Sequence, residues 1–227
     1  MNISKRNKKV ALSRWSKIHS KEVAKILNTE EGLILKSKIC GFLAGDGSVQ
    51  VRKDKKGFYH YQLDFFADDE IMKQTYINLI STVYNKMPSC VIRDNCIHAR
   101  LTSKTIVQDL IKLADFSTKK WTLPYSLFHI NGTIEKWLNG FFSAEAYVSD
   151  KQIRIQTINK EGMLQVSELL TKIDIKNRTY YYSSKKINES DVTIIVIGKK
   201  DSRLKFLNIV GFSHSKKNSK LAKSLNL

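Results

Sequence analysis

One short pattern occurs twice in this sequence, as LKSKICGFLAGDGSV at residues 35–49 and as IEKWLNGFFSAEAYV at residues 134–148. Each is an apolar, helix-like run that ends on a single carboxylate, Asp46 or Glu145, before a strand-like segment. A negative charge at a helix C-terminus is unfavourable by about 0.3–1 kcal/mol, because it meets the negative end of the helix dipole. Two such acids in matched positions therefore indicate function rather than mere solvation.

Small residues four positions apart mark both runs, Gly41 and Gly45 in the first and Gly140 and Ala144 in the second. This spacing puts them on one helix face, where two backbones can approach closely. If the two helices pack along this face, the two acids arrive side by side at one end. A carboxylate pair on a basic protein suggests divalent metal ions that act on a phosphate backbone.

The composition describes a globular and strongly basic protein. It has 227 residues, 42% of them hydrophobic, and a formal net charge of +18. Such an excess most often binds nucleic acid and less often an anionic membrane surface. No apolar run approaches the roughly 20 residues of a membrane span, and the N-terminus lacks the apolar core of a secretory signal. Cys40, Cys90 and Cys96 lack paired ligand spacing, so we expect reduced thiols rather than a zinc site. We therefore expect an intracellular protein, in the cytoplasm or nucleoid of a prokaryote or in an organelle matrix.

The chain reads as two equivalent halves. Apolar periodicity and turn residues predict the order helix, two strands, helix, two strands, helix in each half. Residues 102–117 and 198–213 also match in length and apolar pattern, and a lysine pair follows each. Two such halves imply a pseudo-twofold molecule, which suits the near-twofold symmetry of duplex DNA. We expect a basic extension over 1–30, a first repeat over 31–116, a linker over 117–133 and a second repeat over 134–227.

The expected elements follow from local patterns. Helices are predicted over 19–28, 68–85, 104–114, 160–172 and 201–210, besides the two motif helices. Strands are predicted over 48–52, 59–66, 90–93, 97–101, 152–158, 178–183 and 192–197, and around Val148. The first helix is assigned its start at Ser20, and the basic segment 1–30 is either a solvated helix or an arm along DNA phosphates. Tyr180, Tyr181 and Tyr182 are ambiguous, although tyrosines on a strand pack more often than they stack on bases.

Four short motifs resemble the LAGLIDADG homing endonucleases of the single-chain, two-repeat type. FLAGDG at 42–47 is similar to the first signature motif and GFFSAE at 140–145 to the second. WTLP at 121–124 and VGFSH at 210–214 are also usual in such enzymes. The resemblance implies an α+β fold of two pseudo-symmetric αββαββα repeats packed through the motif helices, with two antiparallel sheets that form a DNA-binding saddle.

The resemblance also implies a chemistry, hydrolysis of phosphodiesters in both strands of a long target site. Its catalytic acids would be Asp46 and Glu145, which would hold Mg²⁺ together with the backbone carbonyls of Gly45 and Ala144. Mn²⁺ also suits these hard oxygen ligands, and Ca²⁺ is expected to bind without supporting cleavage. A basic residue near each phosphate would be Lys120 in one half and Lys217 in the other, with Lys119 and Lys216 as alternatives one position away.

Two positions depart from the family pattern. Ala146 stands where glycine is usual after the second acid, and its Cβ is expected to tighten the turn out of the helix. Asp68 replaces a basic residue near the expected DNA surface. Both departures predict that the two halves differ in activity.

Alternation along the strands predicts which side chains face DNA. Val49, Val51, Leu63, Phe65, Ile153 and Ile155 are expected to face the core. Arginine, glutamine, serine and aspartate are residue types that read base edges in the major groove, whereas lysines on turns contact phosphates. The expected DNA-binding residues are Ser48, Gln50, Arg52, Lys53, Lys55, Lys56, His60, Gln62, Asp64, His98, Arg100, Gln152, Arg154, Gln156, Arg178, Lys185 and Lys186.

The leading interpretation is an intron-encoded, monomeric homing endonuclease that binds double-stranded DNA. The first alternative is a LAGLIDADG protein without cleavage activity, either an RNA-splicing maturase that binds intron RNA or a DNA-binding regulator. The second, a general RNA-binding protein, leaves the paired motif unexplained and lacks an aromatic RNA-recognition signature. A nuclease requires a divalent metal for turnover, and a pure binding protein does not.

Overall fold

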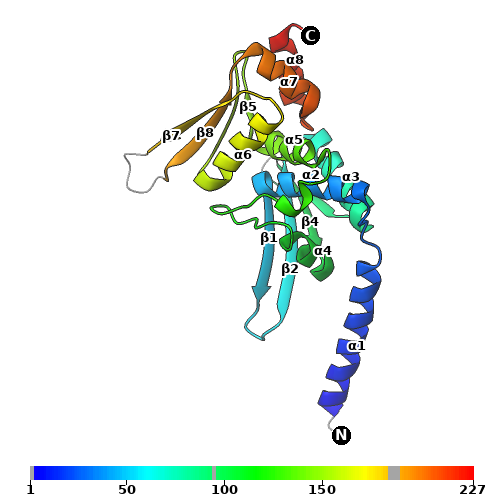
Figure 1. Ribbon diagram of the computed structural model, residues 1–227. Coiled ribbons are helices and arrows are strands. Elements are labelled where there is room, and N and C mark those ends of the chain that lie inside the picture. Colours follow the sequence, from blue (N-terminus) through cyan, green and yellow to red (C-terminus); the bar gives the residue numbers. More distant parts are fainter. Residues whose placement is uncertain (1–2, 94–95, 184–189) are drawn as a thin grey trace.

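The computed structural model describes residues 3–93, 96–183 and 190–227 (Figure 1). Its helices are α1 (Ile3–Val23), α2 (Glu30–Asp46), α3 (Glu70–Tyr84), α4 (Lys104–Ile111), α5 (Thr133–Glu145), α6 (Lys160–Lys172), α7 (Lys200–Ile209) and α8 (Ser215–Leu225), with a 3₁₀ turn at Tyr125–Leu127. Its strands are β1 (Gly47–Lys53), β2 (Tyr59–Ala67), β3 (Ser89–Arg93), β4 (Cys96–Thr102), β5 (Tyr147–Val148), β6 (Ile153–Thr157), β7 (Arg178–Tyr182) and β8 (Val192–Ile197).

The two motif helices, α2 and α5, pack against each other at the centre of the molecule (Figure 1). A Cβ added at Gly41 would lie 2.1 Å from the carbonyl oxygen of Trp137, and one at Gly140 would lie 2.5 Å from that of Lys38. A side chain at either position would hold the helices apart, so glycine is required for this close approach. The prediction that the small residues form the helix–helix contact is confirmed.

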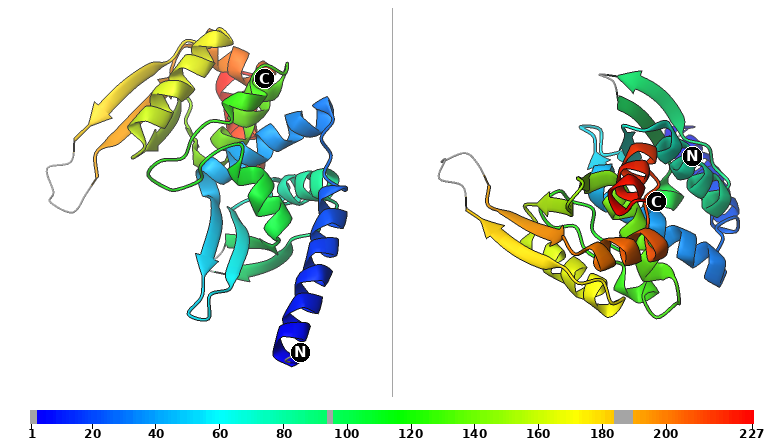
Figure 2. Two further views of the ribbon diagram at one scale, coloured as in Figure 1. Left: turned by 60° about the horizontal axis from the view of Figure 1, so that its bottom comes forward. Right: turned by 90° about the horizontal axis from the view of Figure 1, so that it is seen from above.

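Each motif helix leads into one of two four-stranded antiparallel sheets. The strand orders are β1-β2-β4-β3 and β5-β6-β8-β7, so the second half repeats the topology of the first. The sheets diverge from the α2–α5 pair and leave an open angle between them (Figure 1; Figure 2, left). The predicted α+β fold with two αββαββα repeats is confirmed.

Local signals located most element boundaries correctly. The side chains of Thr29, Asp69, Ser103 and Asn159 cap the N-termini of α2, α3, α4 and α6. Such side chains satisfy backbone N–H groups that the first helical turn leaves unpaired. The α6 boundaries agree with the prediction at both ends. Of the core residues expected from alternation, Leu63, Phe65, Ile153 and Ile155 are buried.

Three expectations about the elements were wrong. The first helix is α1, which continues through Ser20, whose hydroxyl donates to the carbonyl of Ser16 one turn earlier. Val51 is 43% exposed, in the β1–β2 hairpin that projects away from the α2–α5 pair (Figure 1). The three tyrosines Tyr180, Tyr181 and Tyr182 are all exposed rather than packed. The predicted turn at 94–95 and the lysines Lys185 and Lys186 lie outside the described residues.

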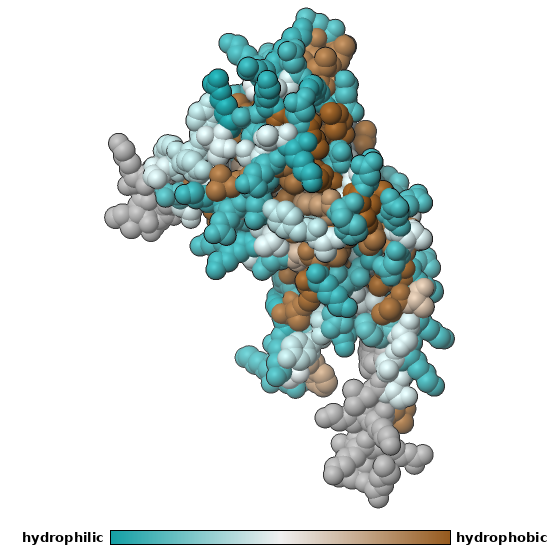
Figure 3. Space-filling view, in the orientation of Figure 1, coloured by the Kyte–Doolittle hydropathy of each residue, from teal (hydrophilic) through white to brown (hydrophobic). Residues whose placement is uncertain are grey.

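The surface in Figure 3 is mainly hydrophilic, with separate apolar patches between the polar side chains. Within the described ranges, no helix has the length and apolar character that a membrane span requires. Helix α1 projects from the body of the protein (Figure 1). It is attached near its C-terminal end, where Glu22 accepts a hydrogen bond from Thr105 at 2.7 Å and pairs with Lys86 at 2.8 Å.

Candidate active site and nucleic-acid interface

The two motif acids are the last residues of the packed helices, Asp46 of α2 and Glu145 of α5. The helix ends meet there, because a Cβ added at Gly45 would lie 2.5 Å from the Cβ of Ala144 and 3.2 Å from the Cγ of Glu145. Both acids are partly buried. The close helix packing thus delivers one carboxylate from each half to a common site between the two sheets.

The environment of these acids opposes their ionisation. Burial raises the pKa of Asp46 to about 6, with a further increase from Asp68 and an opposing effect from Lys217. Burial also raises the pKa of Glu145 to about 7, with a further increase from the charge of Asp46. Two neighbouring carboxylates with raised pKa values form a site where added positive charge is favourable.

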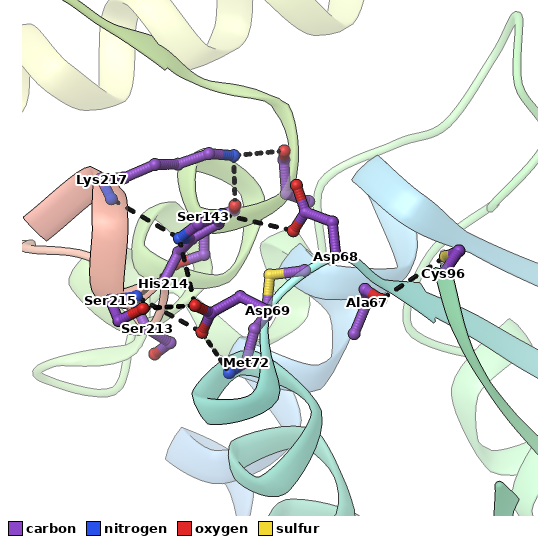
Figure 4. Close-up of polar contacts among 11 residues, drawn as sticks. Ala67, Asp68, Asp69, Met72, Cys96, Ser143, Ser213, His214, Ser215 and Lys217 are labelled. Atoms are coloured by element: carbon purple, nitrogen blue, oxygen red, sulfur yellow. Dashed lines mark hydrogen bonds and ion pairs between the residues drawn. The ribbon is translucent and has the colours of Figure 1, made fainter. Parts of the chain in front are cut away.

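The positive charge of Lys217 lowers the pKa of both acids. Its Nζ donates to the carbonyl oxygens of Ser143 at 2.6 Å and Ala144 at 2.8 Å, at the C-terminal end of α5 (Figure 4). Burial lowers the pKa of Lys217, although four carboxylates act in the opposite direction. An ammonium group has three N–H donors, so one remains for a phosphate oxygen.

The donor set fits a hard divalent cation. It comprises two carboxylates and main-chain carbonyls, the oxygen ligands that Mg²⁺ and Mn²⁺ prefer. The carbonyl of Ala144, expected as a ligand, already accepts a cationic donor. In the described part of the chain, no group of three or more His, Cys, Asp or Glu side chains forms a metal cluster. The remaining ligands of a cation here would therefore be carbonyls, water and phosphate oxygens.

The other expected base, Lys120, is placed differently. It is exposed at the end of a turn, where its backbone N–H donates to the carbonyl of Ser117. Among the described residues, its side chain has no hydrogen bond or ion pair, unlike that of Lys217. Lys119 and Lys216, the alternatives, are also exposed. The structure thus brings one of the two predicted bases to the acids.

The two departures from the family pattern also differ in their effects. Ala146 has φ −77° and ψ 138°, an extended backbone that any residue adopts, so its Cβ causes no strain in the turn. Asp68 is 63% exposed in its side chain, and its charge contributes to the raised pKa of Asp46. An acid at this position adds negative charge beside Asp46 of the first half and beside Lys217 of the second.

The predicted reading face of the first sheet is continuous but not uniformly free. Strand register places on it Ser48, Gln50, Arg52, His60, Gln62, Asp64, His98 and Arg100. Lys53, Lys55 and Lys56 are exposed at the hairpin end of this sheet.

The expectation that Asp64 and His98 stand open on this face was wrong. Both are buried, because His98 Nε2 and Arg100 Nε each lie 2.8 Å from Asp64 Oδ1 and the His98 ring stacks on Phe66. Burial opposes ionisation of Asp64, but hydrogen bonds from Arg100, Gln62 and His98 hold its pKa below the ordinary value. Asp64 therefore orients Arg100, whose side chain is 47% exposed.

The second sheet carries a similar polar face. Arg154 pairs with Val196, which pairs with Arg178, so the two arginines flank one strand on the same face. Arg154 Nη2 donates to Gln156 Oε1 at 2.7 Å. Gln152 lies in the turn before β6 and shares a surface hollow with Arg178 and Tyr180. Tyr181 points to the other face, where Lys160 Nζ lies 4.9 Å from its ring centroid.

Sequence reasoning missed the contacts of three residues around the start of the helix that carries Lys217. Asp69, His214 and Ser215 form polar contacts between α3 and α8 (Figure 4). An aspartate before an apolar helical pattern signals a cap, so the local role of Asp69 was readable. Its contact with Ser215 joins positions 146 residues apart, and no local pattern reports such a pair.

Comparisons with known proteins agree with this architecture. Residues 133–211 match the family described as a LAGLIDADG-like domain. The chain is 27% identical over 208 residues to an uncharacterized protein of Methanocaldococcus jannaschii. The aligned region covers 83% of this chain and 70% of that protein.

Solved structures show the same fold. Variants of the homing endonuclease I-DmoI match with a TM-score of 0.65 and 18% identity, over 79% of this chain and 96% of theirs. The homing endonuclease I-WcaI, bound to its DNA recognition sequence, matches with a TM-score of 0.55 and 18% identity, over 85% of this chain and 86% of its own. I-DmoI has been solved in complex with DNA and Mn, and with DNA and Ca.

The fold is a two-repeat α+β architecture, with one acid at the end of each motif helix. The resemblance to the LAGLIDADG homing endonucleases, expected from the two motifs, is confirmed, and the chain has the fold of their single-chain, two-repeat type.

Proposed function

We propose that this protein is a site-specific endonuclease that hydrolyses both strands of a long DNA target with a divalent metal, Mg²⁺ or Mn²⁺. The observation that carries the proposal is the carboxylate pair, Asp46 and Glu145, held between two sheets with polar and basic faces. Two acids with raised pKa values are costly to keep in a folded protein unless a cation or substrate uses them.

The residues divide the work between binding and chemistry. Arg52, Arg100, Arg154 and Arg178, with the glutamines beside them, would read base edges from the two sheet faces. The exposed lysines of the β1–β2 turn would contact phosphates and so place the duplex. Asp46 and Glu145, with neighbouring carbonyls, would hold the metal. A bound Mg²⁺ would supply a water of lowered pKa and charge neutralisation at the scissile phosphate.

Lys217 would place its free N–H donor near a phosphate oxygen of the scissile group, where negative charge increases during hydrolysis. The protein is proposed to act as a monomer, because both halves of the site are present in one chain.

The proposal is tested by a cleavage selection on a randomised or host-genome DNA library with Mg²⁺ or Mn²⁺, run beside Asp46→Asn. A single long site cut on both strands by the unaltered protein alone is the expected result. Sequence-specific binding without cleavage under any divalent metal would contradict it and would favour the regulator. Tight binding to a structured intron RNA, again without cleavage, would favour the maturase.

Lys217→Met should slow cleavage of one strand by about tenfold or more and produce nicked duplex, because it removes a cation beside the scissile phosphate. Lys120→Met should slow the other strand less, since Lys120 lacks the contacts of Lys217. Strand-specific end labels on a target duplex measure both effects. Lys223→Met, which removes an exposed charge from the last turn of the same helix, is the control. Normal cutting of both strands by both variants would show that these lysines are not the bases.

A further inference from the structure

The N-cap residue of α3 reaches from the first repeat to the last helix of the second. Asp69 Oδ1 accepts the backbone N–H of Met72 at 3.1 Å, which caps α3. The same carboxylate accepts the backbone N–H of Ser215 at 3.3 Å and the hydroxyl of Ser215. Asp69 is 8% exposed, and its three hydrogen bonds hold its pKa below the ordinary value although burial opposes this. One carboxylate thus accepts backbone N–H groups at the start of two helices, one in each half (Figure 4).

The contact leads directly to Lys217. Ser215 is the first residue of α8, and His214 caps that helix by accepting the N–H of Lys217 at 3.5 Å. His214 also lies close to two neighbouring aspartates of the first repeat. Its Nε2 is 3.3 Å from Asp68 Oδ1, and its Nδ1 is 3.7 Å from Asp69 Oδ2. The first turn of α8 is therefore fixed by the first repeat. From this turn Lys217 extends to the carbonyls of Ser143 and Ala144.

An equivalent contact runs in the opposite direction. Asn159 Oδ1 accepts the N–H of Gly162 at 3.1 Å, which caps α6 in the second repeat. Its Nδ2 donates to the carbonyl of Trp121 at 2.7 Å, in the residue directly after Lys120. Asn159 is 6% exposed. Each middle helix thus begins with a buried cap that also holds the lysine segment associated with the other repeat.

We propose that Asp69 and Asn159 are positioning residues that couple the two halves crosswise. Asp69 of the first repeat sets the place of Lys217, and Asn159 of the second sets the segment that carries Lys120. The inference rests on the proposed function, in which these lysines serve the two scissile phosphates. The effect through Asp69 is the larger one, because Lys217 is half-buried with two carbonyl partners and Lys120 is exposed.

The test uses Asp69→Ser and Asn159→Ser, since serine keeps the helix cap but is too short to maintain the crosswise contact. Strand-resolved cleavage of the target is measured at saturating protein. Asp69→Ser is expected to slow, by about tenfold, the same strand that Lys217→Met slows, with the other strand within about twofold. Asn159→Ser is expected to affect the strand that depends on Lys120. Asp69→Ser combined with Lys217→Met should be no slower than Lys217→Met alone, because both act through one side chain.

A second readout does not depend on cleavage. Acetylation of the DNA-free protein, followed by mass spectrometry, should modify Lys217 more slowly than Lys216 in the unaltered chain. Asp69→Ser should accelerate modification of Lys217 and leave Lys216 and Lys120 unchanged. Ser215→Ala, which keeps both caps and Asp69, should act in the same direction and replaces Asp69→Ser if that variant does not fold.

Equal slowing of both strands by Asp69→Ser, or unchanged Lys217 reactivity in the folded variant, would overturn the inference and leave Asp69 a helix cap only. If the unaltered protein cuts no DNA, the proposed function fails, and the acetylation result still decides whether Asp69 positions Lys217.

Discussion

Asp46→Asn and Glu145→Gln are expected to reduce double-strand cleavage by at least about a hundredfold while sequence-specific DNA binding persists. Each change keeps the shape of the side chain and removes the charge that would hold a divalent cation. Binding should persist because it depends on the basic and polar sheet faces, which these variants leave intact.

The measurement combines two assays on one target duplex. Cleavage is followed with Mg²⁺ and Mn²⁺ by strand-specific labels, and binding is followed with Ca²⁺ by fluorescence anisotropy. Asp201→Asn is the matched control, because it also changes a helical carboxylate to an amide. Asp201 is exposed and lies in the first turn of α7, whereas the motif acids are the last residues of their helices. Retained cleavage in either acid variant would contradict the metal-holding role of that acid. Loss of binding and of the folded state would instead indicate a structural role.

The sequence could predict the motif helices and most strands because their signals are local. Glycine and alanine residues four positions apart lie on one face of a helix, and alternate residues lie on one face of a strand, so both patterns can be recognised without knowing the fold. The position of the acid pair followed from these two facts, because both acids end their helices. The outer part of β1 shows the limit of this reasoning. Val51 continues the alternation, but it is exposed in the hairpin that projects away from the α2–α5 pair.

Two helices, α1 and α8, were not predicted correctly, for different reasons. Helix α1 has few apolar residues at helical spacing, so periodicity favoured a short helix that starts at Ser20 instead. Helix α8 has a readable signal in Leu221 and Leu225, which are four apart and buried, but the lysines that dominate the segment obscure this pattern. Because α8 carries Lys217, the missed helix also concealed how that side chain is held.

Contacts distant in sequence were the part of the site that pattern could not predict. Asp64 belongs by alternation to the exposed face, but its charge is covered by His98 and Arg100 from the neighbouring strand. The pairing of Asp69 with Ser215 depends on how the two repeats dock. Residue type and spacing specify neither contact, because both require the three-dimensional arrangement of the strands and helices.

The folded protein is expected to lose stability, in the absence of a divalent metal, as the pH rises from about 4 to about 7. The pKa values of Asp46 and Glu145 are raised from 3.8 and 4.5 to about 6 and about 7, mainly by burial. In this window the folded state binds more protons than the unfolded chain, so the free energy of unfolding decreases with pH and levels off above the folded-state values. The expected loss for the coupled pair is on the order of 2–4 kcal/mol.

Urea unfolding at a series of pH values, in chelator, measures this effect. The Asp46→Asn, Glu145→Gln double variant should show a flatter profile and exceed the unaltered protein in stability at pH 8, whereas Asp201→Asn should retain the original profile. At pH 8 a saturating divalent cation should stabilise the unaltered protein but not the double variant, since the cation binds only the folded site with both charges. An identical pH dependence in the unaltered protein and the double variant would show that the acid pair carries no unfavourable charge. In that case the folded protein would contain no unfavourable carboxylate charge for a bound cation to neutralise.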